Sequence, residues 1–275
     1  MICPNCNGSN FVKHGFVLGV QRFKCTSCGR NVTEKTFSPT YRYRHTIHQI
    51  RAAVALMLLT NASSRTAKTI FSLFMGSSPS NVTLWEWTHK FKDRLDIASR
   101  SFGKVQAGRI WHIDEVFIRV RGSTSKKDCS YLVIVRDQHG AVLAVEVGHR
   151  RDARLIGKAL NRAKKNAKQT PAIVVSDEFR AYPKAVNKAF PKEHKRDNPK
   201  HAHAHFGFRK VQHHNRRYKL SNNCIERTNS FVREWTHGKR GFKSLESAQG
   251  AFEAWAAAHN ARHAGVEFWY KAFPQ

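Results

Sequence analysis

From about residue 108 the sequence alternates between strand-like and helix-like segments, and this pattern restricts the chain to a layered α/β fold. Three strand-like runs precede the first helix-like segment of this region. We therefore expect an antiparallel meander joined to parallel strands, which makes a mixed sheet flanked by helices. The expected segments are the strands 110–121, 130–137, 141–147 and 172–176 and the helices 152–168 and 179–190.

The C-terminal part of the chain is less uniform. A basic stretch over 191–219 gives no indication of its secondary structure. Two further helices are expected after it, at 223–235 and 244–263.

Four cysteines near the N-terminus form two Cys-x-x-Cys motifs, CPNC and CTSC, separated by 18 residues. This spacing is typical of a site in which four thiolates hold one tetrahedral Zn²⁺ ion, with a short hairpin between the motifs. The alternative is two disulfides, which a reducing intracellular environment disfavours. We therefore predict a zinc ribbon with a structural Zn²⁺ ion, held by Cys3, Cys6, Cys25 and Cys28. Cys129 and Cys224 have no such pattern and are expected as small buried residues.

Residues 45–99 have the periodicity of three short helices, and a Gly-Ser-Ser-Pro turn precedes the third. The third helix is expected to begin at a cap formed by Ser80 or Asn81. This arrangement is typical of a helix-turn-helix DNA-binding unit, although helical hairpins that only pack or dimerise have the same pattern. The polar side chains of the third helix that would approach bases are Thr83, Thr88, His89 and Lys92.

Charge is the strongest compositional feature of the chain. Its 48 Lys and Arg residues outnumber the 19 Asp and Glu residues and give a formal net charge of +29, spread along the sequence. Lys and Arg side chains displace counterions from the phosphates that they neutralise, so this surface favours binding to nucleic acid. The alternatives are a basic surface that is only solvated and a protein that binds an anionic membrane. Membrane binding is not favoured, because the sequence contains no strongly amphipathic basic helix.

Neither a membrane span nor an export signal is indicated. The longest apolar run, 52–59, has eight residues, whereas roughly 18 to 20 are needed to span a bilayer. The first residues lead directly into the CPNC motif without the pattern of a secretory signal. We therefore expect a cytoplasmic, nucleoid-associated protein with no membrane partner.

Two aspartates stand where a metal site could form. Asp114 shares the mostly apolar face of strand 110–121, where an ionised carboxylate needs a cation, a cage of backbone amides or a raised pKa. Asp177 follows the apolar strand 172–176, at the end where ligands gather in α/β sheets, but it could also cap the next helix.

A third carboxylate, Glu226, lies near the start of helix 223–235. It belongs to a polar stripe that could face a site, because apolar residues of this helix bury the other stripe. The alternative is a structural role, since the segment beginning at Asn223 has capping-box spacing.

Four segments around these carboxylates resemble DDE transposases of prokaryotic insertion sequences. They are WHIDE at 111–115, RRDA at 150–153, VSDEFRAYPKA at 175–185 and NNCIERTNSFVREWTHGKRGFKSLESAQ at 222–249. The chain is similar to the insertion-sequence-six type, over about residues 105–260. This resemblance implies an RNase H-like domain, commonly behind a helix-turn-helix and sometimes a zinc ribbon, with the catalytic residues Asp114, Asp177 and Glu226.

The resemblance also implies a chemistry. Phosphodiester transfer needs an activated oxygen nucleophile, a stabilised leaving oxygen and neutralised phosphate charge, and two divalent ions about 3.5 to 4 Å apart supply all three. Carboxylate oxygens select Mg²⁺ or Mn²⁺, so the three catalytic residues are also the expected metal ligands. Cleavage at the ends of the element would release 3′ hydroxyls that attack target DNA, and pairing of two ends implies a homo-oligomer, at least a dimer. Basic side chains that could contact phosphates, or be surface charges only, are Arg150, Arg151, Arg233 and Lys239.

One departure concerns the spacing of the second and third carboxylates. Asp177 and Glu226 are 49 positions apart, which is longer than such transposases usually show. Extra residues at 191–205 could form a basic DNA-contacting loop, or the third carboxylate could be Glu234 instead. We prefer Glu226 because it opens the block that carries the resemblance.

Histidines near these segments offer a weaker metal hypothesis. His201, His203 and His205 would share one face of a strand, but no cysteine accompanies them, so a dedicated site is not favoured. His112 lies beside the first aspartate and is expected as a satisfied core histidine rather than an orienting group.

The expected organisation is a zinc ribbon at 1–36, a helix-turn-helix domain at 37–104 and an RNase H-like catalytic domain at 105–275. The function expected for this organisation is metal-dependent cleavage and strand transfer of the ends of an insertion sequence. Two other classes of function stay open. One is a non-catalytic DNA-binding protein, and the other is an RNase H-like nuclease that cuts DNA without joining it.

Overall fold

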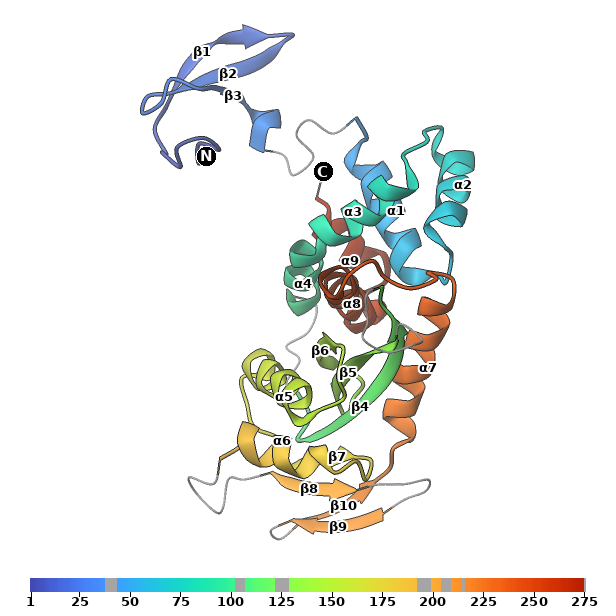
Figure 1. Cartoon of the computed structure of the whole chain (residues 1–275). Helices are drawn as coiled ribbons and strands as arrows, with labels where there is room; N and C mark the ends of the chain where they lie inside the picture. Colours follow the sequence, from blue (N-terminus) through green and yellow to red (C-terminus); the bar gives the residue numbers. More distant parts are fainter. Residues whose placement is uncertain are drawn as a thin grey trace. The chain divides into compact units, whose positions relative to one another are not determined.

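A computed structural model of the protein describes residues 1–37, 44–101, 107–121, 129–191, 199–203, 209–213 and 216–274 (Figure 1). The chain divides into two compact units, residues 1–50 and 51–275. The first unit contains the four N-terminal cysteines, and the second contains the two expected catalytic aspartates and Glu226.

The first unit is built on a three-stranded antiparallel sheet, β1 (Phe11–Val17), β2 (Val20–Cys25) and β3 (Asn31–Thr33), followed by the 3₁₀ helix η1 (Glu34–Phe37). Leu18 and Gly19 connect β1 to β2 with φ values of 49° and 75°. Positive φ at both central residues is the geometry of a tight two-residue hairpin turn. The hairpin expected between the two cysteine motifs is therefore present.

The helical part of the chain begins with α1 (Ile47–Leu59), α2 (Ser64–Met75) and α3 (Asn81–Lys90). The hydroxyls of Ser63 and Ser80 accept hydrogen bonds from the first turns of α2 and α3, and Gly76 ends α2 in the left-handed conformation. These caps fix the turn between α2 and α3, so the expected helix–turn–helix sequence is present.

The third helix ends earlier than the apolar pattern indicated. It ends at Lys90, with Phe91 as its C-cap, and a separate helix, α4 (Lys92–Ser101), follows and packs against α8 (Leu245–Asn260). Helix α3 also contacts α8. Residues 51–101 therefore belong to the same compact unit as the sheet, and the domain boundary expected at 104 stays a prediction.

A five-stranded mixed sheet forms the centre of the second unit. Its strand order is β6-β5-β4-β7-β8, with β4, β5 and β6 antiparallel and β4, β7 and β8 parallel. This is the topology of an RNase H-like sheet and confirms the predicted fold class. The strands are β4 (Ile110–Arg119), β5 (Cys129–Asp137), β6 (Val142–Gly148), β7 (Ile173–Ser176) and β8 (Lys200–His203).

Strand β8 and the following hairpin of β9 (Arg209–His213) and β10 (Arg216–Leu220) lie in the basic stretch that gave no secondary-structure signal. Residues 192–198 of the expected insertion lie outside the described residues, as does His205.

Helices cover the sheet and enclose its core. Helices α5 (Ala153–Ala167) and α6 (Ala181–Ala189) share a core with β4 and β5, which includes Trp111, Ile113 and Tyr182. Helix α7 (Asn223–His237) lies along β4, as Figure 1 shows, and α8 packs on β6. A last helix, α9 (Gly265–Ala272), was not predicted, and no helix in the described ranges is long and apolar enough to cross a membrane.

Candidate active site

Two neighbouring parallel strands bring the predicted aspartates together. The register pairs His112 of β4 with Val175 of β7, so two residues further along each strand Asp114 lies level with Asp177. Carboxylate oxygens of Asp114, Asp177 and the adjacent Glu115 all lie within 4.8 Å of one another. We call these three residues the acidic cluster.

Asp114 is half-buried and is held by two donors. Its Oδ1 accepts from the backbone N–H of Glu115 at 2.8 Å, and its Oδ2 accepts from Nδ2 of Asn229 on α7 at 2.6 Å. Burial, together with the negative charges of Glu115 and Asp177, raises the pKa of Asp114 to about 6, although the hydrogen bonds from Glu115 and Asn229 act to lower it. The carboxylate therefore sits where a cation would relieve an electrostatic penalty.

Asp177 was expected either to bind a ligand at the end of its strand or to cap the next helix, and its contacts have features of both. Its Oδ1 accepts from the backbone N–H of Phe179 at 2.9 Å, which orders the turn after β7, although α6 begins only at Ala181. Its Oδ2 accepts from Arg151 at 2.8 Å. The side chain is 39% exposed, so it is accessible to a ligand.

Glu226 lies on the helix that touches Asp114, but it is not part of the acidic cluster. It precedes Asn229 by three residues, so both lie on one helix face about 4.5 Å apart along the axis. The capping-box alternative is not observed, because α7 starts at Asn223 and its N-cap, Asn222, makes no side-chain cap bond.

A buried arginine fixes the first turns of α7. Nη1 of Arg136, on β5, donates to the carbonyl of Cys224 and to Oγ1 of Thr228 at 2.9 Å. Arg136 and Asn229 thus hold the helix segment that carries Glu226 against the sheet. The alternative third carboxylate, Glu234, instead lines a cavity with Leu58, Trp255 and His259.

Glu115 and its partner Tyr182 were not singled out from the sequence. Its other partner, Arg151, was expected to contact phosphate or to be a surface charge only, and a phosphate contact of Arg151 stays a prediction. The side chain of Glu115 is 3% exposed, and its Oε2 accepts from Nη2 of Arg151 at 3.1 Å and from the hydroxyl of Tyr182. Burial, and then the charge of Glu115, raise the pKa of Tyr182 well above its ordinary value, which keeps its hydroxyl protonated. The only sequence signal is that Glu115 alternates onto the face opposite to Asp114, towards α5 and α6.

The residues predicted to contact DNA fall into two groups. Arg150 and Arg233 are exposed, and Thr83 is half-buried with its backbone N–H and hydroxyl bonded to Ser80. These positions stay predictions.

In the other group, protein contacts occupy the side chain. Thr88 is fully buried and donates to the carbonyl of Leu84, so the expectation that it approaches a base is wrong. Lys92 pairs with Glu253, and His89 bonds the carbonyl of Ser247.

Lys239 is also enclosed by protein groups. Its ammonium donates to the carbonyls of Thr60 and Ala62 at 3.2 and 2.9 Å and lies over the ring of Trp235. Burial lowers the pKa of Lys239 to about 8. In this conformation the ammonium stabilises the loop after α1 and is not directed outward, where it could contact a DNA phosphate.

The histidines form no metal-binding group among the described residues. His201 bonds the hydroxyl of Ser176, His203 bonds the carbonyl of Asp177, and the two rings lie edge to face at 4.6 Å. His112 is 4% exposed, and burial lowers its pKa to about 4. It is therefore a neutral core residue, although its Nδ1 has no hydrogen-bond partner among the described residues, so it is not the satisfied histidine that was expected.

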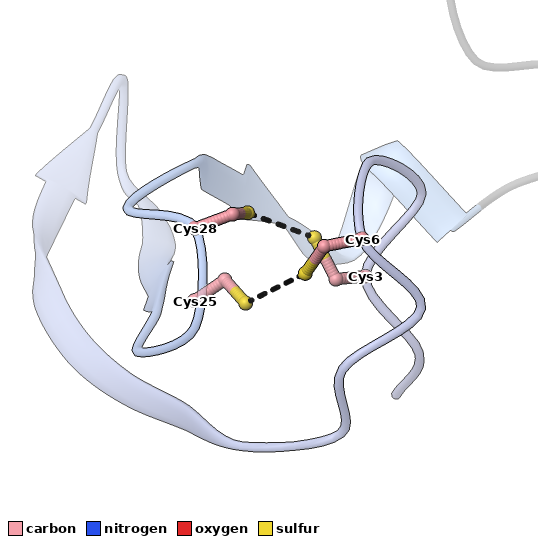
Figure 2. A group of neighbouring side chains, drawn as sticks. All are labelled: Cys3, Cys6, Cys25 and Cys28. Carbon is pink, nitrogen blue, oxygen red and sulfur yellow. Dashed lines mark hydrogen bonds between the residues drawn. The ribbon is translucent and has the colours of Figure 1, made fainter.

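The four N-terminal cysteines converge as predicted. Cys3 Sγ lies 3.6 Å from Cys28 Sγ, and Cys6 Sγ lies 3.6 Å from Cys25 Sγ, so none is in a disulfide (Figure 2). Four sulfurs about 2.3 Å from a tetrahedral ion would be about 3.8 Å apart, so the set fits Zn²⁺. Hydrogen bonds from the backbone of Arg30 and from Asn5 lower the pKa of Cys28 to about 6, which favours a thiolate ligand. Cys129 and Cys224 are half-buried rather than buried.

A mixed five-stranded sheet with one aspartate on β4, a second directly after β7, and a helix docked on the first of them defines an RNase H-like fold. The family model for the DDE domain of IS240-type transposases matches residues 108–264, which is more than half of the chain, and the chain belongs to this family. No curated protein matches it.

Several solved structures are distantly similar. A chain of the simian T-cell lymphotropic virus intasome in complex with the PP2A regulatory subunit B56 gamma is 12% identical, with 74% of this chain and 67% of that chain covered and a TM-score of 0.36. The Mos1 transposase catalytic domain with raltegravir and Mg is 18% identical, with 68% and 92% covered and a TM-score of 0.34. The Mos1 strand transfer complex is 15% identical, with 84% and 78% covered and a TM-score of 0.35.

Proposed function

We propose that the protein is a transposase that cleaves the ends of an insertion sequence and joins them to target DNA with Asp114, Asp177 and Glu226. The observation that carries this proposal is the docking of α7 on Asp114 through Asn229, because it brings the helix of the third carboxylate to the paired aspartates. Membership of the DDE family supports the same reaction class.

The acidic cluster fits Mg²⁺ or Mn²⁺. Its donors are carboxylate oxygens, which these hard cations prefer, and the raised pKa of Asp114 reflects a buried charge that a cation would compensate. Two such ions would activate the attacking oxygen and stabilise the leaving oxygen of a phosphodiester.

The residues of the chain have separate tasks in this proposal. Asp114 and Asp177 supply oxygen ligands from rigid strands, and Glu226 supplies the third from α7. Arg136 and Asn229 set the position of that helix. A ligand on a helix held in this way can be brought to the aspartates by a small shift, because Glu226 is one turn from a residue that already touches Asp114.

DNA binding is proposed from charge and from exposed positions. The net charge of +29 favours phosphate contacts over much of the surface, and the exposed Arg150 and Arg233 belong to the unit that carries the acidic cluster. The α2–turn–α3 segment would read the element ends, with Thr83 near the start of α3. Joining two ends requires at least a dimer, and the N-terminal ribbon would hold one structural Zn²⁺ ion.

The test is a joining assay with labelled element ends, target DNA and Mg²⁺ or Mn²⁺. We expect the full chain to nick the ends and join them, and Asp114→Asn, Asp177→Asn and Glu226→Gln each to reduce both steps by at least about a hundredfold. Glu234→Gln is the matched control and should retain activity within a few-fold. Joining that survives in all three variants would contradict the proposal, and nicking without joining would replace it with a nuclease.

A further inference from the structure

The side chain of Arg151 contacts the acidic cluster, and the backbone next to it is fixed by a helix cap. It directly precedes Asp152, the N-cap of α5, whose side chain accepts from the backbone N–H of Leu155 at 2.8 Å. This cap fixes the backbone beside Arg151, and the guanidinium carbon lies 4.0 Å from the ring centroid of Phe179. The side chain is therefore held in place from its base and along one face.

The guanidinium bridges two carboxylates. Nη2 of Arg151 donates both to Oδ2 of Asp177 at 2.8 Å and to Oε2 of Glu115 at 3.1 Å. Asp177 has its other oxygen bonded to the backbone N–H of Phe179. Both oxygens of Asp177 are thus engaged, and a divalent ion that binds this residue must share or take the oxygen that Arg151 holds.

Glu115 gives Arg151 an anchor that does not depend on Asp177. The Glu115 carboxylate is almost fully buried, and the Tyr182 hydroxyl donates to the same oxygen that Arg151 contacts. Asp177, by contrast, is 39% exposed. An arginine released by Asp177 therefore keeps its bond to Glu115 and its contact with Phe179.

We propose that Arg151 is the resident counter-cation of the acidic cluster, which holds Asp177 while no divalent ion is bound and yields it when the ion arrives. Glu115 is then the anchor of this arginine rather than a metal ligand. This inference rests on the proposed metal site and adds to it a competition between a side-chain cation and the metal. The competition has a definite sign, because removing Arg151 frees Oδ2 of Asp177 and makes the cluster more negative.

The experiment measures Mn²⁺ binding to the full chain by titration calorimetry, without DNA. We expect Arg151→Gln to bind Mn²⁺ roughly fivefold more tightly or better, which is the lower end of usual coupling between two competing ligands. Arg154→Gln is the matched control, because it removes the same charge from an exposed residue of α5 and should change the affinity less than twofold. Unchanged or weaker binding by Arg151→Gln would overturn the inference.

A rescue experiment tests the same competition without relying on one variant. Free guanidinium at low millimolar concentration should weaken Mn²⁺ binding to Arg151→Ala, towards the wild-type affinity, and should not affect the wild type more than an equal concentration of NaCl. Equal effects on both proteins would also contradict the inference.

The proposed metal site is tested separately in the wild-type background. Asp114→Asn and Asp177→Asn should lose Mn²⁺ binding, and a wild-type chain that binds no Mn²⁺ at these residues would overturn the metal site itself. Wild-type binding that these variants abolish, together with no gain in Arg151→Gln, would overturn only the role of Arg151.

Discussion

Nδ2 of Asn229 lies 2.6 Å from Oδ2 of Asp114, and this hydrogen bond joins helix α7 to the central strand of the sheet. Asn229 is buried and Asp114 is half-buried, and Oδ1 of Asn229 has no hydrogen-bond partner among the described residues. In this bond the amide of Asn229 donates and the carboxylate of Asp114 accepts. It connects the helix that carries Glu226 to the first aspartate.

Asn229→Ala should reduce activity more than stability. We expect the free energy of unfolding to fall by about 1 to 3 kcal/mol, because a buried carboxylate loses a donor. Metal-dependent cleavage should fall by about 10- to 100-fold, as is usual when a side chain that orients a metal ligand is removed. Ser230→Ala, at an exposed neighbouring position on α7, is the control for both measurements, and an equal loss in the two variants would contradict the role of Asn229.

Asp114→Asn should stabilise the metal-free protein at neutral pH. The pKa of Asp114 is about 6 in the folded chain against an ordinary value of 3.8, so its contribution to stability is fully present below pH 4 and is lost as the pH rises through 6. In EDTA at pH 7.5 the variant should be more stable by about 1 to 3 kcal/mol, and this difference should shrink towards pH 4.

Urea denaturation at several pH values measures this difference, and added Mn²⁺ should stabilise the wild type but not the variant. Asp96→Asn is the control, since Asp96 pairs with Arg100 at an exposed site of α4 and should have little effect. A difference that does not change with pH would contradict the account.

The sheet and the paired aspartates could be predicted because their signals are local. Apolar runs and alternation identified the strands from β4 to β7, and the end of a buried strand identified Asp177. The contact between Asp114 and Asn229 could not be predicted, because it joins residues 115 positions apart and depends on how α7 docks.

The structure also differs from the sequence-based expectations where contacts between distant elements decide which side chains are buried. Thr88 lies on the face of α3 that is buried with Leu84 and Trp87, and this could not be deduced without knowing that α3 packs against α8. Strands β9 and β10 are rich in Lys and Arg and, within the described ranges, form a separate two-stranded sheet, so their sequence lacks the apolar alternation of a strand in the central sheet.

Two glycine substitutions should have opposite effects on stability. A Cβ atom on Gly238 would lie 1.7 Å from the backbone oxygen of Asn61, so Gly238→Ala must displace the loop after α1 or the end of α7. We expect a loss of more than about 2 kcal/mol. Gly157 lies inside α5, and a Cβ atom added there would have no neighbouring atom within 4 Å, so Gly157→Ala should stabilise by about 0.5 to 1 kcal/mol. Chemical denaturation measures both, and a change of the same sign in the two variants would contradict this interpretation.

Removal of zinc should affect only the N-terminal unit. We expect one zinc ion per chain, lost in Cys28→Ser and retained in Cys224→Ser, because only the first belongs to the four-sulfur group. A chelator should expose residues 1–37 to proteolysis while the main thermal transition, from residues 51–275, keeps its Tm. Zinc that survives Cys28→Ser, or a main transition that disappears with the chelator, would contradict the ribbon assignment.

The most direct test of the account is the anomalous X-ray signal of Mn²⁺ in crystals of the protein with a DNA duplex that carries an element end. We expect two manganese peaks about 3.5 to 4 Å apart, both in contact with Asp114, with Asp177 bound to one ion and Glu226 to the other. Peaks that contact Glu115 in place of Glu226, or no peak at Asp114, would contradict the account.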